Sequence, residues 1–167
     1  FKFQSGGMRA RFSPHDGQLY VSGLKGWQTS GAKDGCLQRV RYTGAEVAMP
    51  RSMNIHKNGI RVGFTQKLDR ELAEDTDSWQ LEQWNYRWTS KYGSKEFKVS
   101  NPDEVGHDKV EVRSARLLPS GKEVFLEIAN LAPVMQMKIS FDLETSDGEE
   151  MIGDLHNTIH ALAEDYR

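Results

Sequence analysis

Cysteine is almost absent from this chain of 167 residues, which contains Cys36 alone. A single cysteine excludes an internal disulfide bond and any Cys-x-x-Cys metal or haem-attachment motif. Because Cys36 lies in an apolar alternation, and free cysteine is among the most buried residue types, we expect a buried and unreactive thiol. The sequence also lacks Gly-x-Gly-x-x-Gly, Walker-type and Gly-x-Ser-x-Gly motifs, so neither a phosphate cradle nor a nucleophile elbow is predicted.

Long hydrophobic runs and an excess of one charge are missing too. No stretch approaches the roughly 18 apolar residues that a membrane-spanning helix needs. The 22 Lys and Arg against 24 Asp and Glu give a net charge of −2, without the basic excess that nucleic-acid binding favours. We therefore expect no membrane span and no nucleic-acid partner. Because the chain begins with Phe1 rather than methionine, we expect it to be cut from a longer protein, and its N-terminus gives no localisation signal.

What the sequence does contain is tryptophan, with three of its four in residues 79–88. In a strand, alternate side chains point to opposite faces, which separates two rows: Trp79 and Leu81, and Trp84, Tyr86 and Trp88. The change of phase between the rows predicts a β-bulge near Glu82 and Gln83. One row would then fill a core while the other faces the surface.

The alternation of apolar residues, interrupted by turn signals, predicts an all-β chain. Residues 1–44 read as three short strands, and residues 45–152 read as a β-sandwich in which Asn58-Gly59 is the strongest hairpin signal. We expect Met135 and Met137 to fill the core of this sandwich. Residues 153–167 read as a short C-terminal helix and tail, because Leu155, Ile159 and Leu162 recur at a spacing of three to four.

Two segments of the first part carry a resemblance to a known family. Residues 12–27 read Phe-Ser-Pro-His-Asp-Gly-Gln-Leu-Tyr-Val-Ser-Gly-Leu-Lys-Gly-Trp, and residues 34–43 read Asp-Gly-Cys-Leu-Gln-Arg-Val-Arg-Tyr-Thr. They resemble the closing blade of glucose/sorbosone dehydrogenase-like β-propellers. More narrowly, they are similar to large secreted bacterial proteins of the membrane-bound dehydrogenase type, in which a propeller is joined to c-type cytochrome and other modules.

This resemblance implies a periplasmic or extracellular location, with the remainder of the parent protein, including its propeller and a cytochrome c module, as the partner. In that family the quinone cofactor and the catalytic groups surround the channel of a complete propeller. Residues 1–44 match at most one blade, so we assign no catalytic residue and no cofactor to this chain. We expect His15, in its Pro-His-Asp-Gly turn, to be exposed to solvent.

The second part of the chain, about residues 52–152, resembles bacterial immunoglobulin-like or fibronectin type III-like sandwiches. The features are a Gly-Ile-Arg-Val-Gly-Phe strand, a Leu-Leu-Pro-Ser-Gly-Lys-Glu-Val-Phe-Leu-Glu-Ile hairpin, and Asn-Leu-Ala-Pro ahead of a final strand. About seven strands with a turn every 8–12 residues are typical of such modules. The Cys–Trp–Cys core of antibody domains is absent.

Two groups of residues are candidates for binding. Planar side chains flanked by amide and charged groups are typical of polysaccharide-binding surfaces, and one segment has that composition: Gln83, Trp84, Asn85, Tyr86, Arg87 and Trp88. The competing interpretations are that two of the aromatic residues are core, or that they dock on the blade that carries Trp27. His156 and His160, one helical turn apart, could ligate a metal with Glu164, although we favour a solvated helix face.

Three hypotheses about function follow. The first is a non-catalytic accessory region of a larger exported, cytochrome-associated sorbosone dehydrogenase-like protein, which braces the propeller and positions neighbouring modules. The second is a carbohydrate-binding module that uses the row of Trp84, Tyr86 and Trp88 on a polysaccharide. The third is a part of a quinoprotein oxidoreductase that acts on sugars, and the sequence leaves open whether the parent protein is an enzyme.

Overall fold

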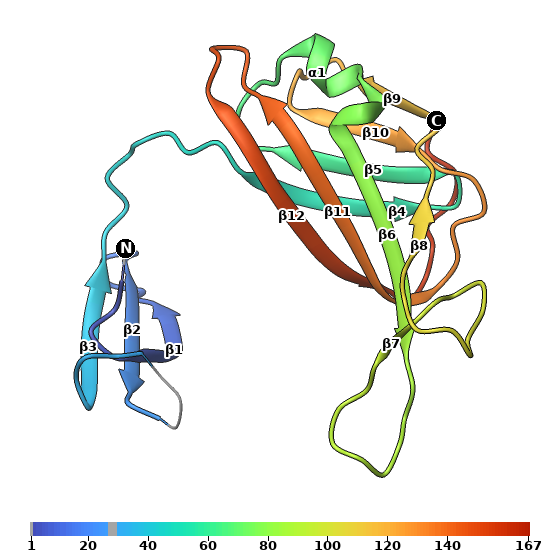
Figure 1. Cartoon of the computed structure of the whole chain (residues 1–167). Coiled ribbons are helices and arrows are strands. Elements are labelled where there is room, and N and C mark those ends of the chain that lie inside the picture. Colours follow the sequence, from blue (N-terminus) through green and yellow to red (C-terminus); the bar gives the residue numbers. More distant parts are fainter. Residues whose placement is uncertain (1, 27–29) are drawn as a thin grey trace. The chain divides into compact units, whose positions relative to one another are not determined.

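The computed structural model describes residues 2–26 and 30–167 and divides the chain into two compact units, Phe1–Glu46 and Val47–Arg167. Both units consist of antiparallel β-sheets, which confirms the predicted all-β class (Figure 1). In the described residues helical structure is confined to α1 (Arg70–Glu74) and the 3-10 turn η1 (Thr76–Ser78).

The first unit is a three-stranded sheet with the order β1 (Gly6–Phe12), β2 (Leu19–Leu24) and β3 (Gly35–Val40). The turn between β1 and β2 closes with a hydrogen bond from the backbone N–H of Gly17, at a φ of 65°, to the Ser13 carbonyl. His15 is exposed in this turn, as predicted. Cys36 is only half-buried, with its Sγ atom 2.9 Å from the Ser5 Oγ atom. Trp27 lies outside the described residues.

The second unit is a sandwich of two sheets (Figure 1). One sheet has the order β4 (Pro50–His56), β5 (Gly59–Phe64), β10 (Glu123–Glu127), β9 (Ser114–Leu117). The other has the order β12 (Glu150–Ile159), β11 (Val134–Glu144), β6 (Trp79–Tyr86), β7 (Glu96–Phe97), and β8 (Asp108–Val110) also pairs with β6. If β4, β5, β6, β9, β10, β11 and β12 are lettered A to G, the two sheets have the strand orders A-B-E-D and G-F-C. This is the strand order of the immunoglobulin fold. Strands β7 and β8 are additional strands after C.

The core between these sheets is closed by three aromatic rings. The ring centroid of Phe64 on β5 lies 5.8 Å from that of Phe141 on β11, and Trp79 on β6 lies 6.3 Å from each. These residues occupy strands B, F and C, where antibody domains place two cysteines and a tryptophan. The indole N–H of Trp79 donates to the Ala73 carbonyl at 3.2 Å, which ties helix α1 to the core.

The predicted C-terminal helix is wrong, because residues 150–159 form strand β12, which pairs with β11 from Glu150 to Ile159. Leu155 and Ile159 are four apart, a spacing that fits one face of a strand as well as one face of a helix. The tail beyond the strand also pairs with a sheet: Ala163 exchanges backbone hydrogen bonds with Ile55 and Lys57 beside β4.

The predicted bulge at Glu82 and Gln83 is also wrong, since β6 pairs with β11 from Trp79 to Trp84 without a register shift. A bulge lies instead on β11, between Val134 and Met137. It turns Met135 outward, so that this side chain is 50% exposed while Met137 is fully buried. The prediction that Met137 fills the core is therefore confirmed, and the same prediction for Met135 is wrong.

Candidate functional site

Trp84 is buried on the side of its sheet that faces away from the core. Because β6 runs without a bulge, Trp84 has the opposite phase to Trp79 and points outward, yet it is only 4% exposed. The ring of His107 covers it in a parallel stack, with centroids 4.0 Å apart and planes 11° apart. His156 approaches its edge, and its indole N–H donates to the Tyr86 hydroxyl at 3.0 Å. Trp84 therefore offers no open face to a ligand.

His107 is held over Trp84 by two carboxylates. Its Nδ1 atom lies 3.1 Å from a Glu82 oxygen, and its Nε2 atom lies 2.6 Å from a Glu96 oxygen. Partial burial alone would lower the pKa of His107. The hydrogen bonds to Glu96 and Glu82, and the charges of these two carboxylates, nevertheless hold this pKa above its ordinary value. The sequence around His107 does not predict this contact, because the partners Glu82 and Glu96 lie on the distant strands β6 and β7.

The three aromatic residues of the predicted binding row do not form one exposed surface. Trp84 is covered, Tyr86 ends strand β6, and Trp88 is 99% exposed in the loop between β6 and β7. That loop extends away from the sandwich (Figure 1). Gln83 is half-buried within β6. The structure does bring Asn85, Tyr86 and Arg87 together, at a groove beside the end of β6, the start of β11 and the end of β12.

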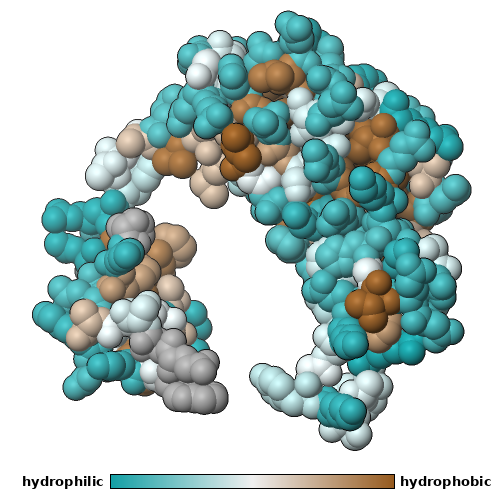
Figure 2. All heavy atoms as spheres, viewed as in Figure 1, coloured by the Kyte–Doolittle hydropathy of each residue, from teal (hydrophilic) through white to brown (hydrophobic). Residues whose placement is uncertain are grey.

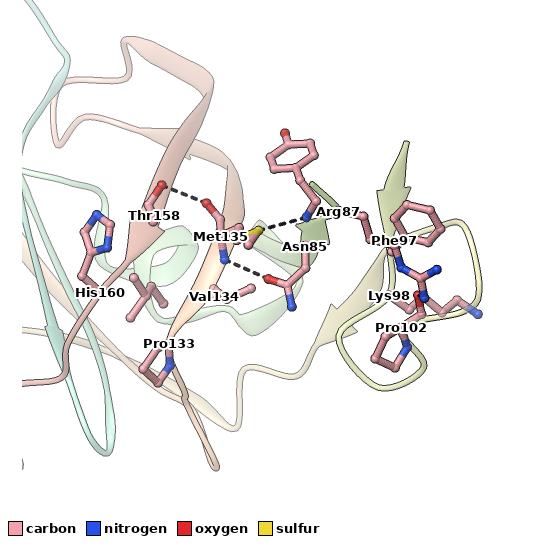
Figure 3. Close-up of a pocket in the computed structure, with 12 residues that line it drawn as sticks. Asn85, Arg87, Phe97, Lys98, Pro102, Pro133, Val134, Met135, Thr158 and His160 are labelled. Carbon is pink, nitrogen blue, oxygen red and sulfur yellow. Dashed lines mark hydrogen bonds between the residues drawn. The ribbon is translucent and has the colours of Figure 1, made fainter. Parts of the chain in front are cut away.

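This groove, which we call the strand-end groove, has a volume of about 590 Å³ (Figure 3). Its lining comes from β6, the start of β11, the end of β12, and the segment around β7. The residues are Asn85, Tyr86, Arg87, Phe97, Lys98, Pro102, Pro133, Val134, Met135, Thr158, Ile159 and His160.

The bulge in β11 organises the middle of the strand-end groove around Met135. The backbone N–H of Met135 donates to the Asn85 Oδ1 atom at 3.0 Å, and its carbonyl accepts from the Thr158 hydroxyl at 2.8 Å (Figure 3). Its sulfur accepts from the backbone N–H of Tyr86 at 3.1 Å. Side-chain atoms of Asn85, Met135 and Thr158 thus serve as hydrogen-bond partners for backbone groups beside the bulge.

Both cations at the groove have anionic partners. Arg87 lies 4.5 Å above the ring of Phe97, and its Nη2 atom lies 2.5 Å from an Asp103 oxygen and also donates to the Pro102 carbonyl. Lys98 forms an ion pair with Glu104, and this hydrogen bond raises the pKa of Lys98.

The segment that carries these acids is anchored at its end by Asp108, which accepts from the backbone N–H and the hydroxyl of Ser100. Burial opposes ionisation of this carboxyl, but the hydrogen bonds from Ser100 and Val99 lower the pKa of Asp108. The segment that contributes Lys98 and Pro102 to the groove is therefore closed on itself by the Ser100–Asp108 hydrogen bonds, and His107 attaches its C-terminal end to Glu82 and Glu96.

The predicted metal pair is not assembled. Because residues 150–159 form a strand, His156 lies on the outer face of the sheet near Trp84, whereas His160 lines the groove. Glu164 is directed elsewhere and pairs with Lys57 at 2.8 Å. Within residues 2–26 and 30–167, no group of three or more His, Cys, Asp or Glu is arranged to hold a metal ion.

Comparisons with protein-family models, curated protein sequences and solved structures found no significant match to this chain. In the part of the chain that the structure describes, no helix is long and apolar enough to cross a membrane.

Proposed function

We propose that this chain is a non-catalytic accessory region of a larger exported protein of the sorbosone dehydrogenase-like type. In this proposal the N-terminal sheet docks on a neighbouring propeller sheet, and the sandwich is a stable body that positions the adjoining modules. The observation that carries the proposal is a row of apolar side chains across the three strands of the N-terminal sheet that is only partly covered.

The register of the N-terminal sheet places an apolar cross-strand row on one face and a basic row on the other, which also carries Leu24 and Leu37. Phe12, Leu19 and Val40 are neighbours across the three strands, and Val21 lies in the adjacent row of the same face. The opposite face has the row Arg11, Tyr20 and Arg39. Cross-strand neighbours point to the same side of a sheet, so the apolar side chains form one continuous surface.

The apolar row of the N-terminal sheet is only partly covered. Among the described residues of the unit, Val21 is the one apolar side chain that is fully buried, at 5% exposure, whereas Phe12 on the same face is 74% exposed. Apolar side chains reach the surface of this unit in Figure 2. Domains below about 70 residues rarely have a large stabilising core and often rely on disulfides, metals or a partner; this unit spans Phe1–Glu46, and the single Cys36 provides no disulfide. A docking partner for the apolar face meets this need.

The sandwich, in contrast, has a core of its own. Side chains from both sheets are fully buried, including Ile60 and Leu126 on one and Ile139 and Leu143 on the other. The aromatic closure by Phe64, Trp79 and Phe141 lies in the same core. A body of this kind suits a positioning role, because it keeps its shape without help from the docking partner.

The proposal can be tested by two matched substitutions in the full-length parent protein. Phe12 and Leu37 are 74% and 72% exposed on opposite faces of the N-terminal sheet. If the apolar face docks, Phe12→Asp should lower the melting temperature of the propeller by several degrees, about the effect of 1–3 kcal/mol. Leu37→Asp should have a much smaller effect. Equal effects of the two substitutions, or no effect of either, would contradict the proposal.

A further inference from the structure

The strand-end groove has the size and the mixed lining of a small-molecule site. Its volume of about 590 Å³ falls within the range of roughly 300–1,000 Å³ that is typical of ligand pockets. Apolar surface is contributed by exposed Pro133, by Met135, which is 50% exposed, and by half-buried Phe97. Such a surface suits a ligand with a flat, weakly polar side.

Three polar side chains of the groove retain hydrogen-bonding capacity. The Asn85 Oδ1 atom must accept from the Met135 N–H, so the amide is oriented with its NH₂ group left to donate. The Tyr86 hydroxyl accepts from Trp84, and its own proton is left to donate. The Thr158 hydroxyl donates to the Met135 carbonyl, so its lone pairs are left to accept. These groups match the donor and acceptor character of ligand hydroxyls.

Charge at the groove argues against an anionic ligand. The guanidinium of Arg87 is engaged by Asp103, Pro102 and the ring of Phe97, and the ammonium of Lys98 is engaged by Glu104. An anion would have to displace a carboxylate or lie beside it, which is unfavourable. A neutral ligand meets no such cost.

We propose that the strand-end groove binds a neutral carbohydrate. A pyranose ring has an apolar CH side for the surface of Pro133 and Met135, and peripheral hydroxyls for Asn85, Tyr86 and Thr158. This site differs from the aromatic row predicted from the sequence, because Trp84 is covered and Trp88 does not line the groove.

The methyl groups of methionine provide a direct test on the whole chain. Met135 lines the groove, and Met137, two residues away, is fully buried in the core. Neutral gluco-, xylo- and manno-oligosaccharides should shift the methyl NMR signal of Met135 at millimolar concentration and leave that of Met137 unchanged. Oligogalacturonates of similar length should bind at least about tenfold more weakly, because they bring carboxylates towards Asp103 and Glu104.

A matched pair of variants on β6 tests the contact itself. Asn85→Asp keeps an oxygen for the Met135 N–H but removes the donor and adds a negative charge, so affinity should fall about tenfold or more. Gln80→Glu makes the same change in charge at an exposed position of the same strand outside the groove, and affinity should not change.

The inference would be overturned if none of the neutral oligosaccharides shifts Met135, if the shifts concentrate on Trp88 and Tyr92 in the loop, or if the acidic sugars bind more tightly. Equal effects of the two variants would also overturn it. The groove belongs to the sandwich and the proposed docking face belongs to the N-terminal sheet, so either proposal can fail while the other stands.

Discussion

The imidazole of His107 lies flat on the indole of Trp84, with ring centroids 4.0 Å apart, on the outer face of the sheet formed by β12, β11 and β6. Glu82 and Glu96 each hold one ring nitrogen. A protonated imidazole between two carboxylates and over an indole is favoured by charge and by the cation–π interaction. The contact connects strand β6, strand β7 and the wall of the strand-end groove.

We expect this contact to make stability depend on pH. The pKa of His107 is raised above its ordinary value near 6.5, so its contribution is complete below about pH 6.5 and is lost as the pH rises through the folded-state pKa. His107→Phe keeps a ring over Trp84 but removes the charge. Urea unfolding should show this variant about 1 kcal/mol less stable near pH 5.5, with a smaller difference near pH 9. A difference that is constant with pH would show that the charge contributes nothing.

The aromatic closure of the core should be the most sensitive part of the sandwich. Phe141→Ala removes the ring that contacts both Phe64 and Trp79, and we expect a loss of about 3–5 kcal/mol in the free energy of unfolding. Ile152→Ala on the adjacent strand, at an exposed position, should change it by less than about 0.5 kcal/mol. Denaturant midpoints of the two variants provide the measurement.

The C-terminal tail should stabilise the edge of the sandwich mainly through Tyr166. Its ring stacks on Phe125 at 4.8 Å, and its backbone N–H and carbonyl both pair with the Asn58 side chain. Tyr166→Ala should cost about 1–2 kcal/mol and speed the amide exchange of Lys57. Glu164→Gln, which removes only the exposed ion pair with Lys57, should cost clearly less than Tyr166→Ala, because solvent screens an exposed ion pair. If the two variants cost the same, the aromatic contact is not what secures the tail.

Gly23 should be essential to the N-terminal sheet and irrelevant to the sandwich. A Cβ atom at this position would lie 1.8 Å from the Gly6 carbonyl oxygen, so Gly23→Ala must separate β1 from β2. In a two-dimensional NMR spectrum, amide signals from these strands should collapse or move to random-coil positions. Signals from β5 and β11 should stay in place, whereas a general loss of dispersion would show that the two units unfold together.

Residue alternation and turn chemistry were sufficient to predict most of the sandwich. The Asn58-Gly59 hairpin and the strands on either side of Pro119 both follow from local sequence. The strand after Glu150 could not be distinguished in this way, because inward residues four apart satisfy both a period of two and a period of 3.6.

The candidate site depended on contacts that local sequence does not contain. Trp84 has the alternation of a surface residue, and the distant His107 and His156 cover it. The bulge that turns Met135 outward follows from the pairing of β11 with β12, and the groove lining is collected from segments more than 70 residues apart. A pattern of residue types therefore located Asn85, Tyr86 and Arg87 but could not indicate the surface that they share.

The rings of Phe64, Trp79 and Phe141 pack between the two sheets at the position where antibody domains have a disulfide bond between strands B and F. Because residues 47–167 contain no cysteine, we expect this sandwich to fold under reducing conditions without a disulfide isomerase. Such a domain suits production and engineering in hosts where antibody fragments fail to form their crosslinks.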